Sequence, residues 1–122
     1  MMRLAAPVLL ATSVLCRADG DLAAQLVKQV MRCWSPPLKE ATRPEQLVVQ
    51  YGVALNLDGS IAQRPQLSAN PLVAAGDPVA RAAADAALRA IWACTPYKMP
   101  PNRYAQWREI VLSFDARRLL TK

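Results

Sequence analysis

The residues that could perform chemistry in this sequence of 122 residues are few, and the cysteines are the most informative among them. They are Cys16, Cys33 and Cys94, and the chain has no histidine. Without histidine, the usual zinc sites and the nucleophilic sites that use a histidine base are excluded. The acidic residues are scattered singly, and the four glycines are not spaced as a phosphate-binding loop requires. We therefore expect no enzymatic activity, no cofactor and no metal.

Cys33 and Cys94 occupy similar places in the sequence. Each lies in the last turn of a predicted helix, and each is followed shortly by a proline. Two helices on the same sheet can bring such ends together, so we predict a Cys33–Cys94 disulfide in an exported protein. The alternative is a pair of buried free thiols that act as small apolar side chains.

The first stretch, residues 1–18, has the pattern of a signal peptide. A basic start at Arg3 precedes about twelve almost entirely apolar residues. As a helix these would rise only about 18 Å, well short of the roughly 30 Å of bilayer hydrocarbon, so we expect export to the periplasm. Cleavage after Ala18 would remove two of the fifteen basic residues and one cysteine, and the net charge would fall from +6 to +4. Cleavage after Ser13, a lipoprotein at Cys16 and a buried helix are the alternatives.

The remainder, residues 19–122, is expected to form one domain that opens with a helix. Apolar residues recur at the spacing that places side chains on one side of a helix. They are Leu22, Leu26, Val27 and Val30. Asp21 is a suitable N-cap, and the helix must end before Pro36 and Pro37 because proline cannot continue it.

A β-hairpin is expected next. Residues 49–55 alternate between large apolar side chains and polar or small ones, the period of a half-buried strand. The sequence Asn-Leu-Asp-Gly at residues 56–59 predicts a turn in which Gly59 supplies a positive φ. Residues 60–67 form the weaker returning strand. Pro65 lacks an N–H group, which places its part of the chain at a sheet edge or at the end of the strand.

The second helix is expected to start at Asp77, its N-cap. It is rich in alanine, and such small side chains let a helix lie close to a sheet. Arg81, Asp85 and Arg89 step by four along the opposite side as a solvated ladder of charges. Trp92 lies toward that ladder, and we expect it to pack in the core; the alternative is partial exposure on that flank.

A third strand is expected near the end of the chain. Ile110, Leu112 and Phe114 alternate there with Val111 and Ser113. The order of elements is therefore α-β-β-α-β. The predicted fold class is α+β, with a three-stranded antiparallel sheet covered on one face by two helices.

A long loop, residues 95–108, joins the second helix to the third strand. It contains Tyr97, Tyr104 and Trp107 together with three prolines. A long ordered loop of this kind either binds a partner or packs back on the domain as a strap. The sequence fits a partner surface and a strap equally, so the three aromatic residues are candidate partner-binding residues.

The positive net charge raises nucleic acid as a possible partner. However, the basic residues are dispersed along the chain, and no ribbon of aromatic and basic residues of the kind that stacks bases is present. We expect no nucleic acid partner.

Several short motifs follow one another in a specific order: RCWSPP at residues 32–37, LNLDGSI at 55–61, GDP at 76–78, CTPYKMPP at 94–101 and REIVLSFD at 108–115. In this order they resemble the C-terminal domain of TolA, in the TolA/TonB energy-transducer family, over roughly residues 22–120. The resemblance implies a periplasmic domain of the cell envelope that binds protein partners of the Tol–Pal or TonB type. It also implies β-augmentation, in which an extended segment of the partner adds to an exposed sheet edge.

In that family the receiving edge is the last strand. Here it corresponds to Ile110, Val111, Leu112, Ser113 and Phe114. A full transducer also has a membrane anchor and a helical stalk, which this sequence lacks, so we expect a free-standing, non-enzymatic binding module. A proline at Leu112 should then abolish capture of the partner. The alternative is a small structural or inhibitory envelope protein that binds through the loop at residues 97–107.

Overall fold

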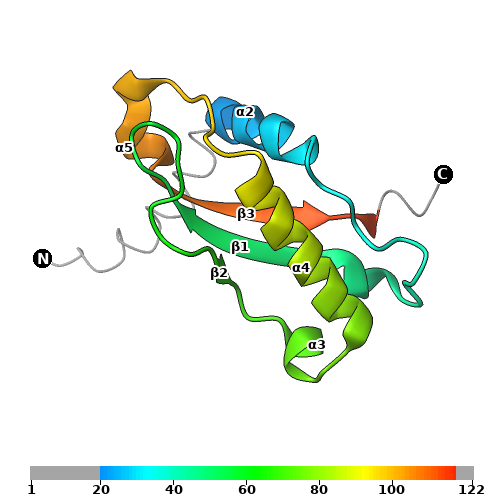
Figure 1. Cartoon of the computed structure of the whole chain (residues 1–122). Coiled ribbons are helices and arrows are strands. Elements are labelled where there is room, and N and C mark those ends of the chain that lie inside the picture. Colours follow the sequence, from blue (N-terminus) through cyan, green and yellow to red (C-terminus); the bar gives the residue numbers. More distant parts are fainter. Residues whose placement is uncertain (1–19, 118–122) are drawn as a thin grey trace, which may run out of the picture.

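The computed structural model describes residues 20–117, which contain all the elements expected of the domain (Figure 1). The elements in chain order are α2 (Gly20–Met31), η1 (Pro44–Leu47), β1 (Val48–Ala54), β2 (Gln66–Leu67), α3 (Pro71–Ala74), α4 (Pro78–Ala93), η2 (Pro101–Arg103), α5 (Tyr104–Trp107) and β3 (Glu109–Asp115). The signal peptide expected over residues 1–18 lies outside the described residues. None of the helices within residues 20–117 is long and apolar enough to cross a membrane.

The sheet has three strands in the order β2-β1-β3, and both pairs are antiparallel. The predicted α+β fold is therefore confirmed. The pairing of β1 with β3 is complete, from Val48 opposite Asp115 to Ala54 opposite Glu109. Because β1 is central, β3 forms one edge of the sheet over its whole length.

The returning strand is much shorter than the eight residues predicted. Only Gln66 and Leu67 pair with β1, and a separate bridge joins Leu55 to Ile61. The pairing register differs by two residues between these places. The Ala62 N–H still donates to the Ala54 carbonyl at 2.8 Å, and residues 63–65 then leave the ladder. Pro65, which has no N–H group to donate, lies at the point where pairing resumes.

The two long helices share the core with one face of the sheet. Most of the residues that are at most 4% exposed come from α2, α4, β1 and β3. Among them are Leu22, Leu26 and Val30 of α2, Ala87 and Ile91 of α4, Val49 and Val53 of β1, and Leu112 and Phe114 of β3. In Figure 1, α4 crosses in front of the strands and α2 lies beside β3. The opposite face of the sheet carries exposed side chains such as Gln50 and Val111.

Local signals that involve backbone geometry are confirmed. Gly59 has a φ of +88° in the hairpin turn. Asp77 caps α4, since its Oδ1 accepts hydrogen bonds from the N–H groups of Val79 and Ala80 at 2.9 and 3.0 Å. Asp21, predicted as an N-cap, lies instead in the first turn of α2, which begins at Gly20.

The two tryptophans beside the cysteines have different environments. Trp34 packs edge-on against Phe114, with ring centroids 5.4 Å apart. Trp92 is 47% exposed, so the expectation that it packs in the core is wrong. The alanines of α4 already fill the space between that helix and the sheet, and the large indole lies on the flank of the helix.

Candidate functional site

The outer edge of β3 is the candidate functional site. Two backbone hydrogen bonds extend its ladder with β1: the Leu55 N–H donates to the Arg108 carbonyl at 2.8 Å, and the Ala116 N–H donates to the Leu47 carbonyl at 3.2 Å. In an antiparallel pair, residues alternate between those that exchange hydrogen bonds with the partner strand and those that point away. Arg108 and Ala116 therefore both hydrogen-bond to residues next to β1, and every second residue between them hydrogen-bonds to β1 itself. Leu112 is one of these, so its N–H and C=O groups face β1, whereas those of Val111 point outward.

The same alternation applies along the whole edge. The N–H and C=O groups of Glu109, Val111 and Ser113 point away from β1. In the part of the chain that the structure describes, no strand pairs with β3 on that side. These groups therefore form a row of donors and acceptors at the spacing that an added strand requires.

The side chains of β3 alternate in step with its backbone. Leu112 and Phe114 are 3% and 0% exposed and belong to the core under the helices. Val111, 47% exposed, and Ser113 lie on the open face of the sheet. The Gln50 Nε2 donates to the Ser113 Oγ at 2.9 Å, which links β1 and β3 on that face. The five predicted edge residues therefore divide by role: the core residues fix the strand, and the outward ones present the edge.

A hollow of about 650 Å³ lies on the open face beside the first half of β3. Gly52 and Val111 are paired across the two strands and both line this hollow. Because Gly52 has no side chain, the Val111 side chain meets no cross-strand neighbour there. An apolar side chain of an added strand has room beside Val111.

The opposite edge of the sheet is less suited to strand addition. β2 contains only two residues, and Pro65 precedes it without an N–H group. A strand of seven residues offers a longer ladder, so β3 is the better edge.

The loop predicted as either a partner surface or a strap packs back on the domain. Tyr97 and Trp107 are 2% and 0% exposed. The Trp107 Nε1 donates to the Pro100 carbonyl at 2.8 Å, and the Tyr104 hydroxyl donates to the Leu55 carbonyl at 2.7 Å. Burial raises the pKa of Tyr97 to about 12. We call residues 95–108 the strap, because their aromatic side chains pack against the domain and fix the position of the start of β3.

The Cys33–Cys94 disulfide is present, and its Cα atoms are 6.1 Å apart. Cys33 follows α2, and Cys94 is the C-cap residue of α4. The disulfide therefore joins the C-terminal ends of the two helices that cover the sheet. Within the described residues, no group of three or more His, Cys, Asp or Glu side chains could hold a metal ion.

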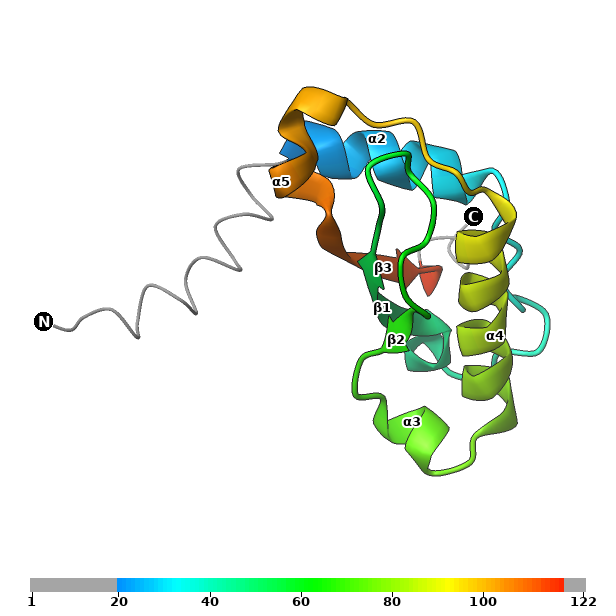
Figure 2. The same cartoon turned by 60° about the vertical axis from the view of Figure 1, so that its left-hand side comes forward.

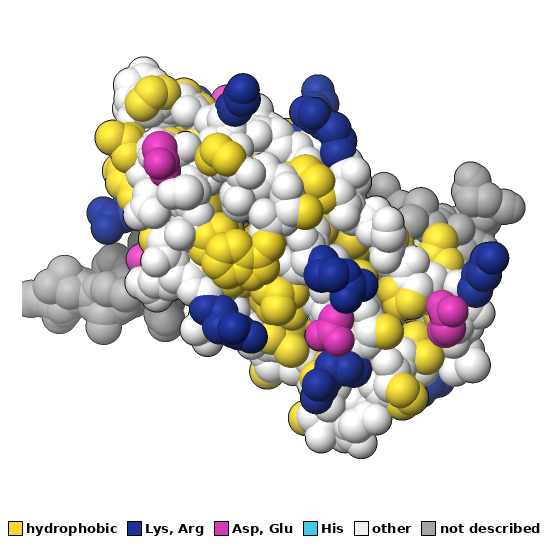
Figure 3. Space-filling view, viewed as in Figure 1, with side chains coloured by type: hydrophobic (Ala, Val, Ile, Leu, Met, Phe, Trp, Pro, Cys, Tyr) yellow, Lys and Arg dark blue, Asp and Glu magenta, His cyan; other side chains and the backbone are white. Residues whose placement is uncertain are grey.

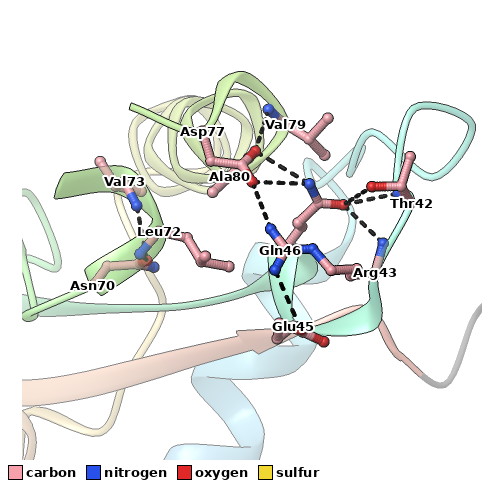
Figure 4. Close-up of polar contacts among 10 residues, drawn as sticks. All are labelled: Thr42, Arg43, Glu45, Gln46, Asn70, Leu72, Val73, Asp77, Val79 and Ala80. Carbon is pink, nitrogen blue, oxygen red and sulfur yellow. Dashed lines mark hydrogen bonds and ion pairs between the residues drawn. The ribbon is translucent and has the colours of Figure 1, made fainter. Parts of the chain in front are cut away.

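A polar cluster at the start of α4 was not anticipated from the sequence (Figure 4). Gln46, only 4% exposed, donates from Nε2 to both carboxylate oxygens of Asp77, at 3.2 and 3.0 Å. Its Oε1 accepts from the backbone N–H groups of Thr42 and Arg43 at 2.8 and 2.9 Å. The Arg43 Nη2 lies 3.1 Å from the Asp77 Oδ2. A single glutamine between two prolines and a strand gives no sequence signal of this kind.

This cluster predicts a pH dependence of stability. The hydrogen bond from Gln46, followed by the helix N–H of Ala80, holds the pKa of Asp77 below its ordinary value of 3.8. A carboxylate whose pKa is lowered by folding contributes stability above its unfolded pKa and loses it as the pH falls through its folded pKa. The advantage of the native protein over Asp77→Asn in urea unfolding should be full at pH 7 and decline below pH 3.8. A difference that stays constant from pH 7 to pH 2 would contradict this.

The geometry defines the class of protein: a small α+β domain with two helices on one face of the sheet and, on one edge, a seven-residue strand with which no second strand among the described residues pairs. A family profile described as "Uncharacterised conserved protein UCP034077" matches residues 18–114. The chain belongs to this family. The comparison with curated proteins gave no match, and neither did the comparison with solved structures.

Proposed function

We propose that this protein is a non-enzymatic binding module of the cell envelope that captures an extended segment of a partner protein by strand addition at β3. The observation that carries the proposal is the outward row of backbone groups at Glu109, Val111 and Ser113. Each outward N–H can donate a hydrogen bond to an added strand, and each outward C=O can accept one. The resemblance to the TolA C-terminal domain, given above, supports a partner of the Tol–Pal or TonB type.

The proposal includes export to the periplasm with removal of residues 1–18. The disulfide between Cys33 and Cys94 supports this location, because disulfides persist in oxidising compartments. The alternative, an inhibitory protein that binds through the strap, has less support because the Tyr97 and Trp107 side chains are buried. We therefore propose no partner contact for the strap aromatics in this conformation.

The strand-addition proposal predicts the effect of a proline on the edge. Leu112 is a poor position for this proline, because the Leu112 N–H faces β1 and the Leu112 side chain is 3% exposed. A proline there would disrupt the sheet and the core as well as the edge. At Val111 the lost N–H points outward, so Val111→Pro removes a donor from the free edge and leaves the ladder with β1 paired. We expect partner binding at least about tenfold weaker. Val111→Thr, which keeps the N–H and a β-branched side chain, should bind normally.

Cross-linking in cells that make the protein supplies the measurement. A photoreactive amino acid at position 113 lies on the proposed edge, and one at the exposed Lys39 is the control. Adducts with an envelope protein should form at position 113 and disappear when Val111→Pro is added, and mass spectrometry identifies the partner. Equal adducts at both positions, or adducts only with a second copy of the chain, would reject the proposal.

A further inference from the structure

A groove of about 450 Å³ separates α4 from the segment that leads into β2, and we call it the α4–β2 groove. It exists because residues 63–65 leave the ladder and do not cover this flank of the helix. Leu67, Val73 and Leu88 give it an apolar lining, and Tyr51 of β1 lies at its base. Leu67 is 36% exposed, so part of this apolar surface faces solvent. Figure 2 shows the returning segment beside α4.

Trp92 extends this apolar surface along the helix. It follows Leu88 by four residues, so the two side chains lie on the same side of α4. The indole is 47% exposed, and within residues 20–117 its N–H group has no hydrogen-bond acceptor. In Figure 3, hydrophobic side chains gather at the centre of this face, with basic side chains on both sides of them. Exposed tryptophan in such a setting is typical of protein interfaces.

The charges around the groove are mostly positive. Arg64 lines one side, and Arg81 and Asp85 line the side formed by α4. Arg89 follows Asp85 by one turn, so three cations surround one anion. All three arginine side chains belong to exposed residues, and none forms an ion pair with a described acidic residue. Burial raises the pKa of Tyr51, while Asp85 raises it further and Arg64 and Arg81 lower it, so these charges act on the base of the groove.

We propose that the α4–β2 groove is a second docking surface, which binds an acidic peptide segment of a partner protein that also carries large apolar side chains. Carboxylates of the peptide would pair with the unpaired guanidinium groups, and its apolar side chains would contact Leu88 and Trp92. This surface lies on the opposite flank of β1 from β3. The proposal for this groove does not depend on strand addition at β3.

Other occupants fit the groove less well. A second copy of the chain is disfavoured by repulsion, because the chain without residues 1–18 carries a net charge of +4 and the groove is itself basic. A flat anionic membrane would meet the Asp85 carboxylate between Arg81 and Arg89. A peptide can place a hydrogen-bond donor opposite Asp85 and carboxylates opposite the arginines.

Fluorescence anisotropy with a labelled dodecapeptide tests the proposal. In this probe, glutamates alternate with leucines and phenylalanines. We expect saturable binding that weakens by about tenfold or more in Arg64→Glu/Arg81→Glu, and that also weakens as salt is raised. Trp92→Ala should weaken binding as well. Arg64, Arg81 and Trp92 are exposed, so these variants should keep the unfolding midpoint of the native protein.

Matched controls separate the groove from bulk charge and from the sheet edge. Arg32→Glu/Lys39→Glu makes the same change in net charge at exposed positions outside the groove and should bind the probe normally. Val111→Pro, which blocks the β3 edge, should also bind it normally. The proposal is overturned if the native protein does not bind, if both charge-reversal variants lose binding equally, or if only Val111→Pro abolishes it. Binding to phosphatidylglycerol vesicles without binding to the peptide also overturns it.

Discussion

The Cys33→Ala/Cys94→Ala variant is expected to be about 4 kcal/mol less stable than the oxidised native protein. The disulfide closes a loop with a sequence separation of 61 residues. In the chain-entropy account, such a cross-link removes conformations from the unfolded chain, and the effect grows with the length of the loop. A domain of this size typically has 5–15 kcal/mol of stability in total, so the loss is a large share.

Urea unfolding with and without a thiol reductant measures this effect. Reduction should lower the unfolding midpoint of the native protein to that of the double alanine variant, and the variant itself should not respond to the reductant. Alkylation of the untreated protein should leave Cys33 and Cys94 unmodified. An unfolding midpoint of the native protein that does not change on reduction would contradict the predicted stabilisation. Alkylation of Cys33 and Cys94 in the absence of reductant would contradict it as well.

Gly59→Ala is the second change with a large expected effect. Gly59 has a φ of +88°, and a Cβ at this position would lie 1.8 Å from the Tyr97 carbonyl oxygen. The neighbouring atom belongs to the backbone and cannot rotate away. The Tyr97 N–H also donates to the Gly59 carbonyl at 2.9 Å, so a shift of the strap would break this hydrogen bond. We expect a loss of about 3 kcal/mol or more, from backbone strain and the lost contact together.

Gly76 offers a matched control for this substitution. Its φ of +87° is nearly the same, but a Cβ there would meet nothing within 4 Å. Gly76→Ala should therefore show the backbone strain alone, about 1–2 kcal/mol. The difference between the two variants in chemical denaturation reports the close contact between the hairpin turn and the strap. Equal losses in the two variants would show that this contact does not contribute.

The sequence was sufficient for features that depend on residues near one another in the chain. The turn at Gly59, the cap at Asp77 and the alternation in β3 each follow from the conformational needs of a few adjacent residues. The disulfide was predictable because two helices on one sheet bring their ends together. The family resemblance added the expectation that the last strand binds a partner. Which residues of that strand direct their backbone groups outward could be decided only from the pairing register with β1.

Other features that depend on contacts between distant segments were not predictable. Gln46 is buried only because Asp77, far along the chain, provides a partner for its amide. The returning strand is short because its register shifts by two residues, which no local pattern indicates. Trp92 was expected in the core on the basis of its residue type, yet the alanines of α4 leave no space there for an indole. The α4–β2 groove results from the register shift, and the exposed Trp92 extends its apolar surface along α4.

The strap has a consequence for how the length of this chain can vary among relatives. Trp107 is fixed in the core only a few residues before Leu112, and inward and outward residues alternate strictly along β3. An insertion of one residue between them would turn every core side chain of the strand toward solvent and every edge residue toward the helices. An insertion at the exposed Pro101 or Asn102, after the buried Tyr97, would lengthen only a surface connection. Natural variation in length should therefore concentrate upstream of Tyr104, and the spacing from Trp107 into β3 should stay constant.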